Sequence, residues 1–323
     1  MIIKNNFSPL ESLVHPLFAK HSVQVQIKRD DLLHPIISGN KSRKLKFNLK
    51  HIQQQGYQGA ISFGGSYSNH IHAFAFACYQ HNIPCIGVIR GEAHYANNYT
   101  LSWAQHWGMK CHFVDRKTYK RRFDDDFLAE LAHQYPNHFI VPEGGSNPLA
   151  IDGVSEVIDE LNQQTSFDTL MTPLGSGGTL AGLVSGDEKY ARMNNQAQHN
   201  ILGIAVLKRA EYLIEEVKKL MPKTGNNHHF WKVMTEFHCG GYGKFSAKDV
   251  ARLIDFNQQV APTFEPVYSG KMLLALLDLL EQGYFNVNER IVLLHTGGLQ
   301  GLGGMFEQKR LTPSDWPPLP LPT

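Results

Sequence analysis

The amino-acid sequence predicts an α/β protein with two open parallel sheets, each covered by helices on both faces. Three observations favour this class. The chain has 323 residues, which is more than a single hydrophobic core usually serves. Short apolar strand patterns alternate with helical patterns, as expected of parallel strands joined by right-handed crossovers. Hydrophobic residues make up 42% and charged residues 19% of the chain, a composition typical of globular proteins.

The first half of the chain predicts an arm followed by alternating strands and helices. We expect residues 1–22 to form an irregular arm. Val23, Val25 and Ile27 alternate with polar residues, which predicts a half-buried strand. A helix beginning near Lys41 follows, with apolar residues on one face. Further strands are expected at 60–63, 85–89, 111–114 and 138–141, and further helices at 70–80, 101–107 and 127–134.

A second run of strands and helices begins near Thr169. Strands are expected at 170–174, 201–206 and 291–294, and helices at 180–190, 210–221, 247–259 and 271–282. The tail from Pro313 to Pro322 is too rich in proline for a helix or a central strand. We expect residues 1–54 and 161–323 to form a large domain and residues 55–160 a small one.

Charge and composition exclude several classes of partner. The net charge is only +2, so no strong field attracts nucleic acid. No apolar run approaches the roughly 20 residues that span a bilayer, and the first residues lack the apolar core of a signal peptide. The 4 cysteines form no C-x-x-C pair, which fits a reducing compartment, and we expect a cytoplasmic protein. The 17 histidines form no recognisable ligand motif, so no metal site is predicted.

The stretch Ser38-Gly39-Asn40-Lys41-Ser42-Arg43-Lys44 carries a lysine into the first turn of a basic helix. The positive end of the helix dipole and the charges of Arg43, Lys44 and Lys46 favour the neutral form of the Lys41 amine. A neutral amine is a nucleophile, so we interpret Lys41 as a candidate Schiff-base lysine. The alternative is a basic helix face exposed to water.

The turn Gly175-Ser176-Gly177-Gly178-Thr179 joins a predicted strand to a predicted helix. Its backbone N–H groups can converge on an anion, and the helix adds its positive end, so the turn predicts a phosphate site. The dinucleotide fingerprint requires glycine where Leu180 stands, which disfavours a nicotinamide cofactor. The alternative is a tight glycine turn without a ligand.

Two further turns carry polar groups at the ends of predicted strands. Gly64-Gly65-Ser66-Tyr67-Ser68-Asn69 presents Ser68 and Asn69 for a substrate carboxylate or a ring oxygen, with helix capping as the alternative. His295-Thr296-Gly297-Gly298 presents the Thr296 hydroxyl for a buried heterocycle, and again a helix cap is the alternative.

As a set, these residues resemble the pyridoxal-phosphate enzyme family that contains D-cysteine desulfhydrase and 1-aminocyclopropane-1-carboxylate (ACC) deaminase, within the tryptophan-synthase-β fold type. The resemblance runs nearly end to end. It is carried by Lys28-Arg29-Asp30-Asp31, Gly39 to Leu45, Gly64-Gly65 with Ser68-Asn69-His70, Glu143 to Asn147, Gly175 to Thr179, Pro266-Val267-Tyr268 with Gly270-Lys271, and His295 to Gly298.

The resemblance implies fold type II, with pyridoxal 5′-phosphate in the cleft between the domains, bound mainly by the large one. It also implies a small amino-acid substrate and a homodimer. Lys41 would carry the cofactor as a Schiff base and shuttle protons. The implied catalytic residues are Lys41, Ser68, Tyr242 and Tyr268. The implied cofactor-binding residues are Lys41, Asn69, Gly175, Ser176, Gly177, Gly178, Thr179 and Thr296.

The family's two reactions require different partners for the pyridine nitrogen. ACC has no α-hydrogen, so opening its ring requires a strong electron sink, which a carboxylate beside the nitrogen provides. The resemblance implies a glutamate at position 269 for ACC deaminase, whereas this chain has Ser269, and Thr296 would face the nitrogen. The sequence therefore favours α,β-elimination from D-cysteine to pyruvate, hydrogen sulfide and ammonia. ACC deaminase and a non-catalytic cofactor-binding protein are the alternatives.

Overall fold

The computed structural model describes residues 7–222, 230–312, 314 and 316. Residues 1–6, on which the prediction about a signal peptide depends, lie outside the described residues. Most of the proline-rich tail lies outside them as well, so the prediction for the tail is not tested.

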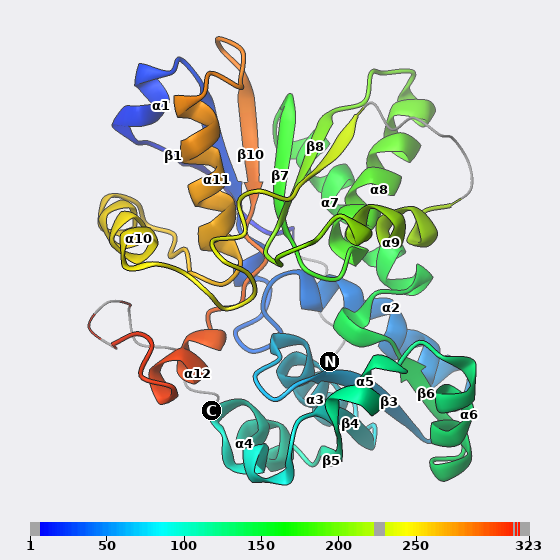
Figure 1. The fold of residues 1–323 in the computed structure, drawn as a ribbon. Coiled ribbons are helices and arrows are strands. Elements are labelled where there is room, and N and C mark those ends of the chain that lie inside the picture. The colour runs from blue at the N-terminus through cyan, green and yellow to red at the C-terminus, as the bar shows by residue number, and fades with distance from the viewer. Residues whose placement is uncertain (1–6, 223–229, 313, 315, 317–323) are drawn as a thin grey trace.

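Two sheets form the framework of the molecule, one above the other in Figure 1. The 6-stranded sheet has the order β1-β2-β10-β7-β8-β9, and the 4-stranded sheet has the order β5-β4-β3-β6. All neighbouring strands are parallel except β1, which pairs antiparallel with β2 at the edge of the larger sheet. The prediction of an α/β fold with two open parallel sheets is confirmed.

The elements follow the predicted alternation closely. The strands are β1 (Leu10–Leu13), β2 (Gln24–Lys28), β3 (Gly59–Gly65), β4 (Cys85–Arg90), β5 (Lys110–Val114), β6 (His138–Val141), β7 (Thr169–Leu174), β8 (Asn200–Ala205), β9 (Trp231–Met234) and β10 (Arg290–Leu294). The helices are α1 (Pro16–Lys20), α2 (Asn40–Gln54), α3 (Asn69–Gln80), α4 (Tyr99–His106), α5 (Arg116–Lys120), α6 (Asp125–Gln134), α7 (Pro148–Gln164), α8 (Gly178–Asn194), α9 (Tyr212–Leu220), α10 (Ala247–Gln259), α11 (Ser269–Glu281) and α12 (Gly301–Glu307).

The prediction of an irregular arm over residues 1–22 is wrong where the structure describes the chain. Strand β1 pairs with β2, with Leu10 opposite Lys28. Helix α1 begins with Pro16, and the His15 imidazole caps it by accepting a hydrogen bond from the Leu17 amide at 3.3 Å. Pairing with β2 is a tertiary effect, but a proline in the first helical position is a local start signal that the sequence contained.

The sequence analysis also missed α5, α7, β9 and α12. The longest of these, α7, has visible start signals, because Asn147 caps the Ala150 amide and Pro148 occupies the first turn. Strand β9 has only 4 residues and is defined by pairing with β8. Short elements of this kind depend on a neighbouring strand or helix more than on local pattern.

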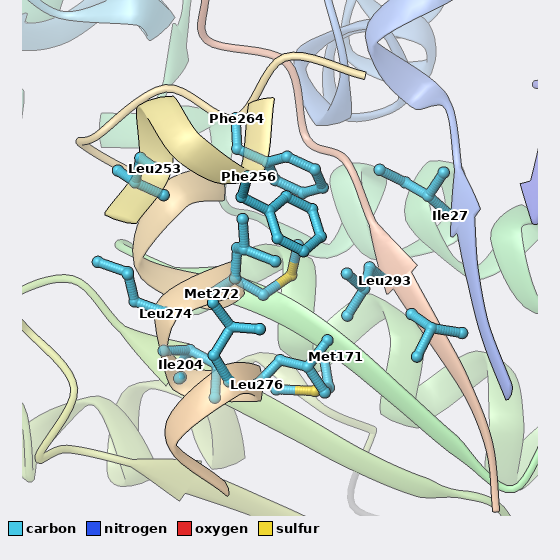
Figure 2. Packing of buried hydrophobic residues seen from close by; sticks show 14 of the residues in the cluster. Ile27, Met171, Ile204, Leu253, Phe256, Phe264, Met272, Leu274, Leu276 and Leu293 are labelled. Atoms are coloured by element: carbon cyan, nitrogen blue, oxygen red, sulfur yellow. The ribbon is translucent and has the colours of Figure 1, made fainter. Parts of the chain in front are cut away.

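Each sheet has a hydrophobic cluster on both faces. Figure 2 shows one cluster of the larger sheet, where Met171 and Leu293 on the strands pack against Met272 and Leu276 on α11. The opposite face is covered by α7, α8 and α9. In the smaller sheet, α3 and α4 share a cluster with α2.

The predicted division into domains at residues 54/55 and 160/161 stays a prediction. The strands of the smaller sheet all lie between residues 55 and 160. However, α7 packs its apolar side chains into a cluster of the larger sheet, and α2 packs Leu45, Leu49 and Ile52 into a cluster of the smaller one. These two helices therefore connect the parts of the molecule that the sheets define.

Candidate active site

The Lys41 segment lies directly against the Thr296 segment. Gly39 adopts a positive φ of 68°, and a Cβ atom at this position would collide with the Thr296 carbonyl. The Asn40 amide donates a hydrogen bond to the same carbonyl at 3.3 Å. A glycine is therefore required for the chain to turn into α2 at this point, with Lys41 in the first helical turn.

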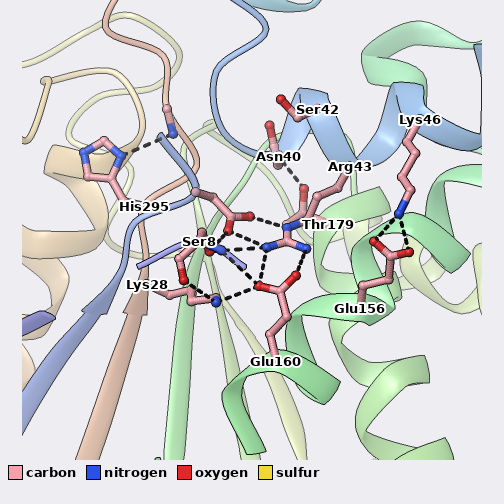
Figure 3. Close-up of polar contacts among 12 residues, drawn as sticks. Ser8, Lys28, Asn40, Ser42, Arg43, Lys46, Glu156, Glu160, Thr179 and His295 are labelled. Carbon is pink, nitrogen blue, oxygen red and sulfur yellow. Dashed lines mark hydrogen bonds and ion pairs between the residues drawn. The ribbon is translucent and has the colours of Figure 1, made fainter. Parts of the chain in front are cut away.

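The same segment also contacts the predicted phosphate turn. The side-chain amide of Asn40 donates a hydrogen bond to the Thr179 hydroxyl at 2.7 Å, as Figure 3 shows. The Lys41 amine donates to the Asn40 side-chain oxygen at 2.8 Å. Three segments that are far apart in the sequence thus meet at Asn40, and the structure brings Lys41 together with the turn at 175–179.

Burial lowers the pKa of the Lys41 amine to about 8. The lowered pKa was expected, but the cause differs from the one that the sequence suggested. Arg43 is neutralised by Asp30 and Glu160, and the Lys46 amine pairs with Glu156 at 2.6 Å. Desolvation, and not the charge of these neighbours, therefore lowers the pKa of Lys41. The alternative of a basic helix face in water is wrong.

A second lysine, Lys44, lies at the phosphate turn, and the sequence analysis gave it no role of its own. Its amine donates to the Gly144 carbonyl and to the Ser146 hydroxyl, both at 3.2 Å. A Cβ atom on Gly178 would lie 3.0 Å from this amine. Burial, and next the charge of Lys41, hold the pKa of Lys44 well below its usual value. An anion in the turn would stabilise the protonated form of this lysine.

The phosphate turn has the local geometry that an anion site requires. Gly177 has a φ of 83°, and α8 begins at Gly178 with its free N–H groups directed toward the turn. The Ser176 hydroxyl lies 2.9 Å from the Ser146 hydroxyl. A Cβ atom on Gly178 would contact Ser146, so this glycine allows the two turns to approach each other.

Asn69 and Tyr268 flank Gly298 at the end of β10. A Cβ atom on Gly298 would lie 3.2 Å from the Asn69 side-chain nitrogen and 3.8 Å from the Tyr268 ring. The Tyr268 hydroxyl donates a hydrogen bond to the Tyr242 hydroxyl at 3.1 Å, and the two rings meet edge to face. Desolvation raises the pKa of both phenols, so both are neutral near pH 7.

Ser68 and His70 occupy the start of α3. The Ser68 hydroxyl caps the helix by accepting a hydrogen bond from the Ile71 amide at 3.3 Å, so the capping alternative is confirmed for this residue. The His70 imidazole, to which the sequence analysis assigned no role in the site, lies 2.7 Å from the Ser62 hydroxyl. Burial, and next the charges of Lys41 and Lys44, hold the pKa of His70 well below its usual range.

Glu265 is a buried carboxylate that the sequence analysis missed. It accepts hydrogen bonds from the Val267, Tyr268 and Ser269 amides at 2.6, 2.8 and 2.8 Å, and thereby caps the start of α11. The Ser269 hydroxyl also lies 3.3 Å from it. Burial raises the pKa of Glu265 to about 7. Such a residue is hard to recognise in sequence, because its role depends on the fold of the turn.

Thr296 is buried, and its carbonyl accepts a hydrogen bond from the Asn40 backbone amide. Its hydroxyl has no hydrogen-bond partner among the residues that the structure describes. The alternative of a helix cap is wrong for Thr296, because α12 begins only at Gly301. The hydroxyl oxygen is not among the buried polar atoms that lack a partner, so it is accessible and can bond to a ligand group.

Together these groups fit a phosphorylated aldehyde that binds to a lysine. The turn at 175–179 and Lys44 would hold the phosphate, Lys41 would hold the aldehyde carbon, and Asn69 and Thr296 would contact polar atoms of the ring. No group of three or more histidine, cysteine, aspartate or glutamate side chains suited to a metal ion occurs within the described residues. No helix of the described chain is long and apolar enough to cross a bilayer.

Comparison with known proteins agrees with this assignment. The model of a family described as pyridoxal-phosphate dependent enzyme matches residues 8–297. A putative 1-aminocyclopropane-1-carboxylate deaminase from Pyrococcus abyssi is 32% identical over 87% of this chain and 86% of its own length. A D-cysteine desulfhydrase from Klebsiella pneumoniae is 26% identical over 91% of this chain and 92% of its own.

The fold comparison gives the same family. The crystal structure of an ACC deaminase homologue superimposes with a TM-score of 0.78 and 26% identity, covering 95% of this chain and 94% of that one. The expected fold type II and the expected cofactor, pyridoxal 5′-phosphate, are confirmed. This chain belongs to the family of pyridoxal-phosphate-dependent enzymes whose members include proteins named ACC deaminase and D-cysteine desulfhydrase.

Proposed function

We propose that this enzyme catalyses α,β-elimination from a small amino acid, with D-cysteine as the substrate. Removal of the α-proton and loss of hydrogen sulfide from Cβ gives aminoacrylate. Water then replaces the nitrogen, so the products are pyruvate and ammonia. The bound cofactor supplies the electron sink that makes the α-proton acidic.

One observation supports this choice over the deamination of ACC. The group available for the pyridine nitrogen is the Thr296 hydroxyl, because the carboxylate of Glu265 is bonded to three backbone amides and the Ser269 hydroxyl is bonded to Glu265. A hydroxyl sustains a weaker electron sink than a carboxylate does. The weaker sink suffices for removing an α-proton, which D-cysteine has and ACC lacks.

The roles that we propose follow from the environment of each side chain. Lys41, whose pKa is lowered to about 8, holds the cofactor and afterwards moves the α-proton. The N–H groups at the start of α3, beside Ser68, hold the substrate carboxylate. Tyr268 and Tyr242, joined by a hydrogen bond of 3.1 Å, exchange a proton with the departing sulfur. Asn69 and Thr296 orient the cofactor ring.

The substrate assignment is tested by product analysis of the purified holoenzyme. D-Cysteine, L-cysteine and ACC are supplied separately, and sulfide, pyruvate and 2-oxobutyrate are quantified. We expect sulfide and pyruvate in equal amounts from D-cysteine, and no product from the Lys41→Ala variant. Release of 2-oxobutyrate from ACC as the main activity would favour ACC deaminase instead. The relative from Pyrococcus abyssi carries that name. A yellow holoenzyme that releases no product would indicate a protein that only binds the cofactor.

We also propose a homodimer in the cytoplasm. The homodimer is suggested by the family. The cytoplasmic location is supported by Cys78, Cys85, Cys111 and Cys239, all of which are free thiols in the structure. Light scattering of the holoenzyme tests the first proposal, and cell fractionation tests the second.

A further inference from the structure

Lys271 is a fully buried lysine in the first turn of α11, and the reaction proposed above gives it no role. Its amine donates to the Gly241 carbonyl at 2.6 Å and to the Val206 carbonyl at 3.3 Å. No carboxylate forms an ion pair with it among the residues that the structure describes. Burial lowers the pKa of the amine to about 8. Lysine is almost never fully buried without a paired acid, so the two carbonyl contacts distinguish this residue.

The Gly241 carbonyl lies at the centre of the loop that carries Tyr242. The Gly241 amide donates to the His238 carbonyl at 3.0 Å, and the Lys244 amide donates to the Gly241 carbonyl at 3.0 Å. Gly241 therefore belongs to two successive turns, and Tyr242 is the second residue of the later turn. The Lys271 amine thus bonds to the peptide group that directly precedes Tyr242.

The backbone of this loop is unusual. It has positive φ angles of 51°, 92°, 113° and 61° at Cys239, Gly240, Gly241 and Gly243. Such a backbone belongs to no helix or strand and is held by contacts from outside the loop. Tyr242 itself is 45% exposed, so core packing does not fix its ring. The position of its hydroxyl therefore depends on how the loop is anchored.

Lys271 connects the loop to the rest of the proposed site. The Val206 amide donates to the Leu174 carbonyl at 3.0 Å, and Leu174 directly precedes the phosphate turn. Tyr268 lies three residues before Lys271, at the helix start that Glu265 caps. One amine therefore ties the loop to the end of the larger sheet and to the element that carries the second tyrosine.

We propose that Lys271 is a positioning residue, which holds the Gly241 carbonyl and thereby keeps the Tyr242 hydroxyl against that of Tyr268. The proposal rests on the elimination proposed above. As the Cβ–S bond breaks, its electron pair leaves with the sulfur. The tyrosine pair donates a proton to the sulfur, so that hydrogen sulfide departs, and regains a proton from water. Proton transfer requires hydrogen-bond distance, so a displaced Tyr242 impairs this step.

Hydrogen exchange tests the hold on the loop without any measurement of activity. Residues 238–244 are followed by mass spectrometry in the wild-type and Lys271→Met holoenzymes. Loss of a hydrogen bond from a charged group should make the loop exchange about 10-fold faster in the variant. The turn at 64–69 serves as the internal control and should exchange at the same rate in both proteins. An unchanged rate in the loop would overturn the proposal.

Turnover is tested with two leaving groups. Lys271→Met should lower kcat for D-cysteine by about 10-fold or more and leave KM within about 2-fold, because a transferred proton contributes to the chemical step. β-Chloro-D-alanine loses chloride, a stable anion that requires no proton. Its kcat should stay within about 2-fold of the wild-type value, because the tyrosine pair is not needed for that departure. Pyruvate is measured for both substrates.

A double-mutant cycle shows whether Lys271 acts through Tyr242. In a Tyr242→Phe background, Lys271→Met should lower kcat for D-cysteine by no more than about 2-fold further, because the hydroxyl is already absent. Leu276→Ala removes core packing from the same helix and is the control for general destabilisation. It should lower the unfolding temperature and change kcat for either substrate by less than about 2-fold.

A second variant alters the loop and leaves the buried lysine in place. Gly241→Ala strains the backbone, because a φ of 113° disfavours any side chain. It should show the same selective loss for D-cysteine, also if Lys271→Met does not fold. Equal losses for the two substrates, or additive losses in the cycle, would overturn the role of Lys271. A wild-type enzyme that releases no sulfide would overturn the D-cysteine assignment, whereas faster loop exchange in Lys271→Met would still support its hold on Tyr242.

Discussion

At the scale of single residues, the central question is which lysine binds the cofactor, because several buried lysines have lowered pKa values. Lys28 pairs with Glu160 at 2.6 Å, and the Lys271 amine donates to two backbone carbonyls, at 2.6 and 3.3 Å. Lys44 is directed into the phosphate turn. Among the residues that the structure describes, Lys41 donates only to its neighbour Asn40, so its amine is the one available for a covalent bond.

The pH dependence of cofactor uptake follows from this assignment. Burial lowers the pKa of Lys41 to about 8, and only the neutral amine attacks the aldehyde. We expect the rate of pyridoxal-phosphate uptake by the apoenzyme to rise with pH and to level off above about pH 8. Stopped-flow absorbance measures this rate, with Lys41→Ala as the control. A rate that is already maximal well below this pH would contradict the assignment.

The residue types of the site could be predicted from the sequence only in part. The Lys41 segment and the turn at 175–179 were recognisable, because nucleophilic amines and glycine-rich strand-to-helix turns have local signatures. Lys44 and Glu265 were not recognisable as site residues. Their importance depends on burial and on a capped helix start, neither of which is written in the local pattern.

At the scale of secondary-structure elements, a buried ion network fixes the start of α2. The Arg43 guanidinium bonds to Asp30 at 2.6 and 2.7 Å. It also bonds to Glu160 at 2.8 and 3.0 Å, as Figure 3 shows. Lys28 on β2 completes the network by pairing with Glu160 on α7. Because Arg43 lies two residues after Lys41, the network anchors the turn that presents the lysine.

Removal of Arg43 should therefore be costly. We expect Arg43→Met to lower the free energy of unfolding by about 3–5 kcal/mol, because it leaves the buried Asp30 carboxylate without its cation and removes one of the two cations that pair with Glu160. Arg121→Met removes an exposed pair and should cost less than about 1 kcal/mol. Urea denaturation of the apoenzymes measures both values. Similar losses in the two variants would mean that the network does not stabilise the fold.

The elements themselves were largely predictable from periodicity, and the exceptions have physical reasons. Strands such as β3 and β7 are short, largely buried runs that lead into glycine-rich turns, and these were found. Strands β1 and β9 have 4 residues each and lie at the two edges of the larger sheet. A short edge strand is defined by its partner, so its own sequence carries little signal.

At the scale of the whole molecule, the site joins elements of both sheets. Asn69 follows β3 of the smaller sheet, whereas the turn at 175–179 and Thr296 follow β7 and β10 of the larger one. A single ligand that contacts all of them links the two sheets. Figure 1 shows α2, which carries Lys41, between the two sheets.

Cofactor binding should for this reason stabilise the entire chain. A ligand that binds only the folded state at 100 times its dissociation constant adds about 2.7 kcal/mol to the free energy of unfolding. We expect a single cooperative unfolding transition that shifts upward with pyridoxal phosphate, measured by calorimetry. Two separate transitions, of which only one responds to the cofactor, would show that the site does not link the sheets.

Chemical trapping of the cofactor tests the central claim most directly. The holoenzyme is reduced with borohydride, which makes the bond between the cofactor and its lysine permanent, and the labelled residue is identified by peptide mass spectrometry. The assignment predicts that the label is on Lys41. A label on Lys44 or Lys271 in the wild-type protein would contradict it.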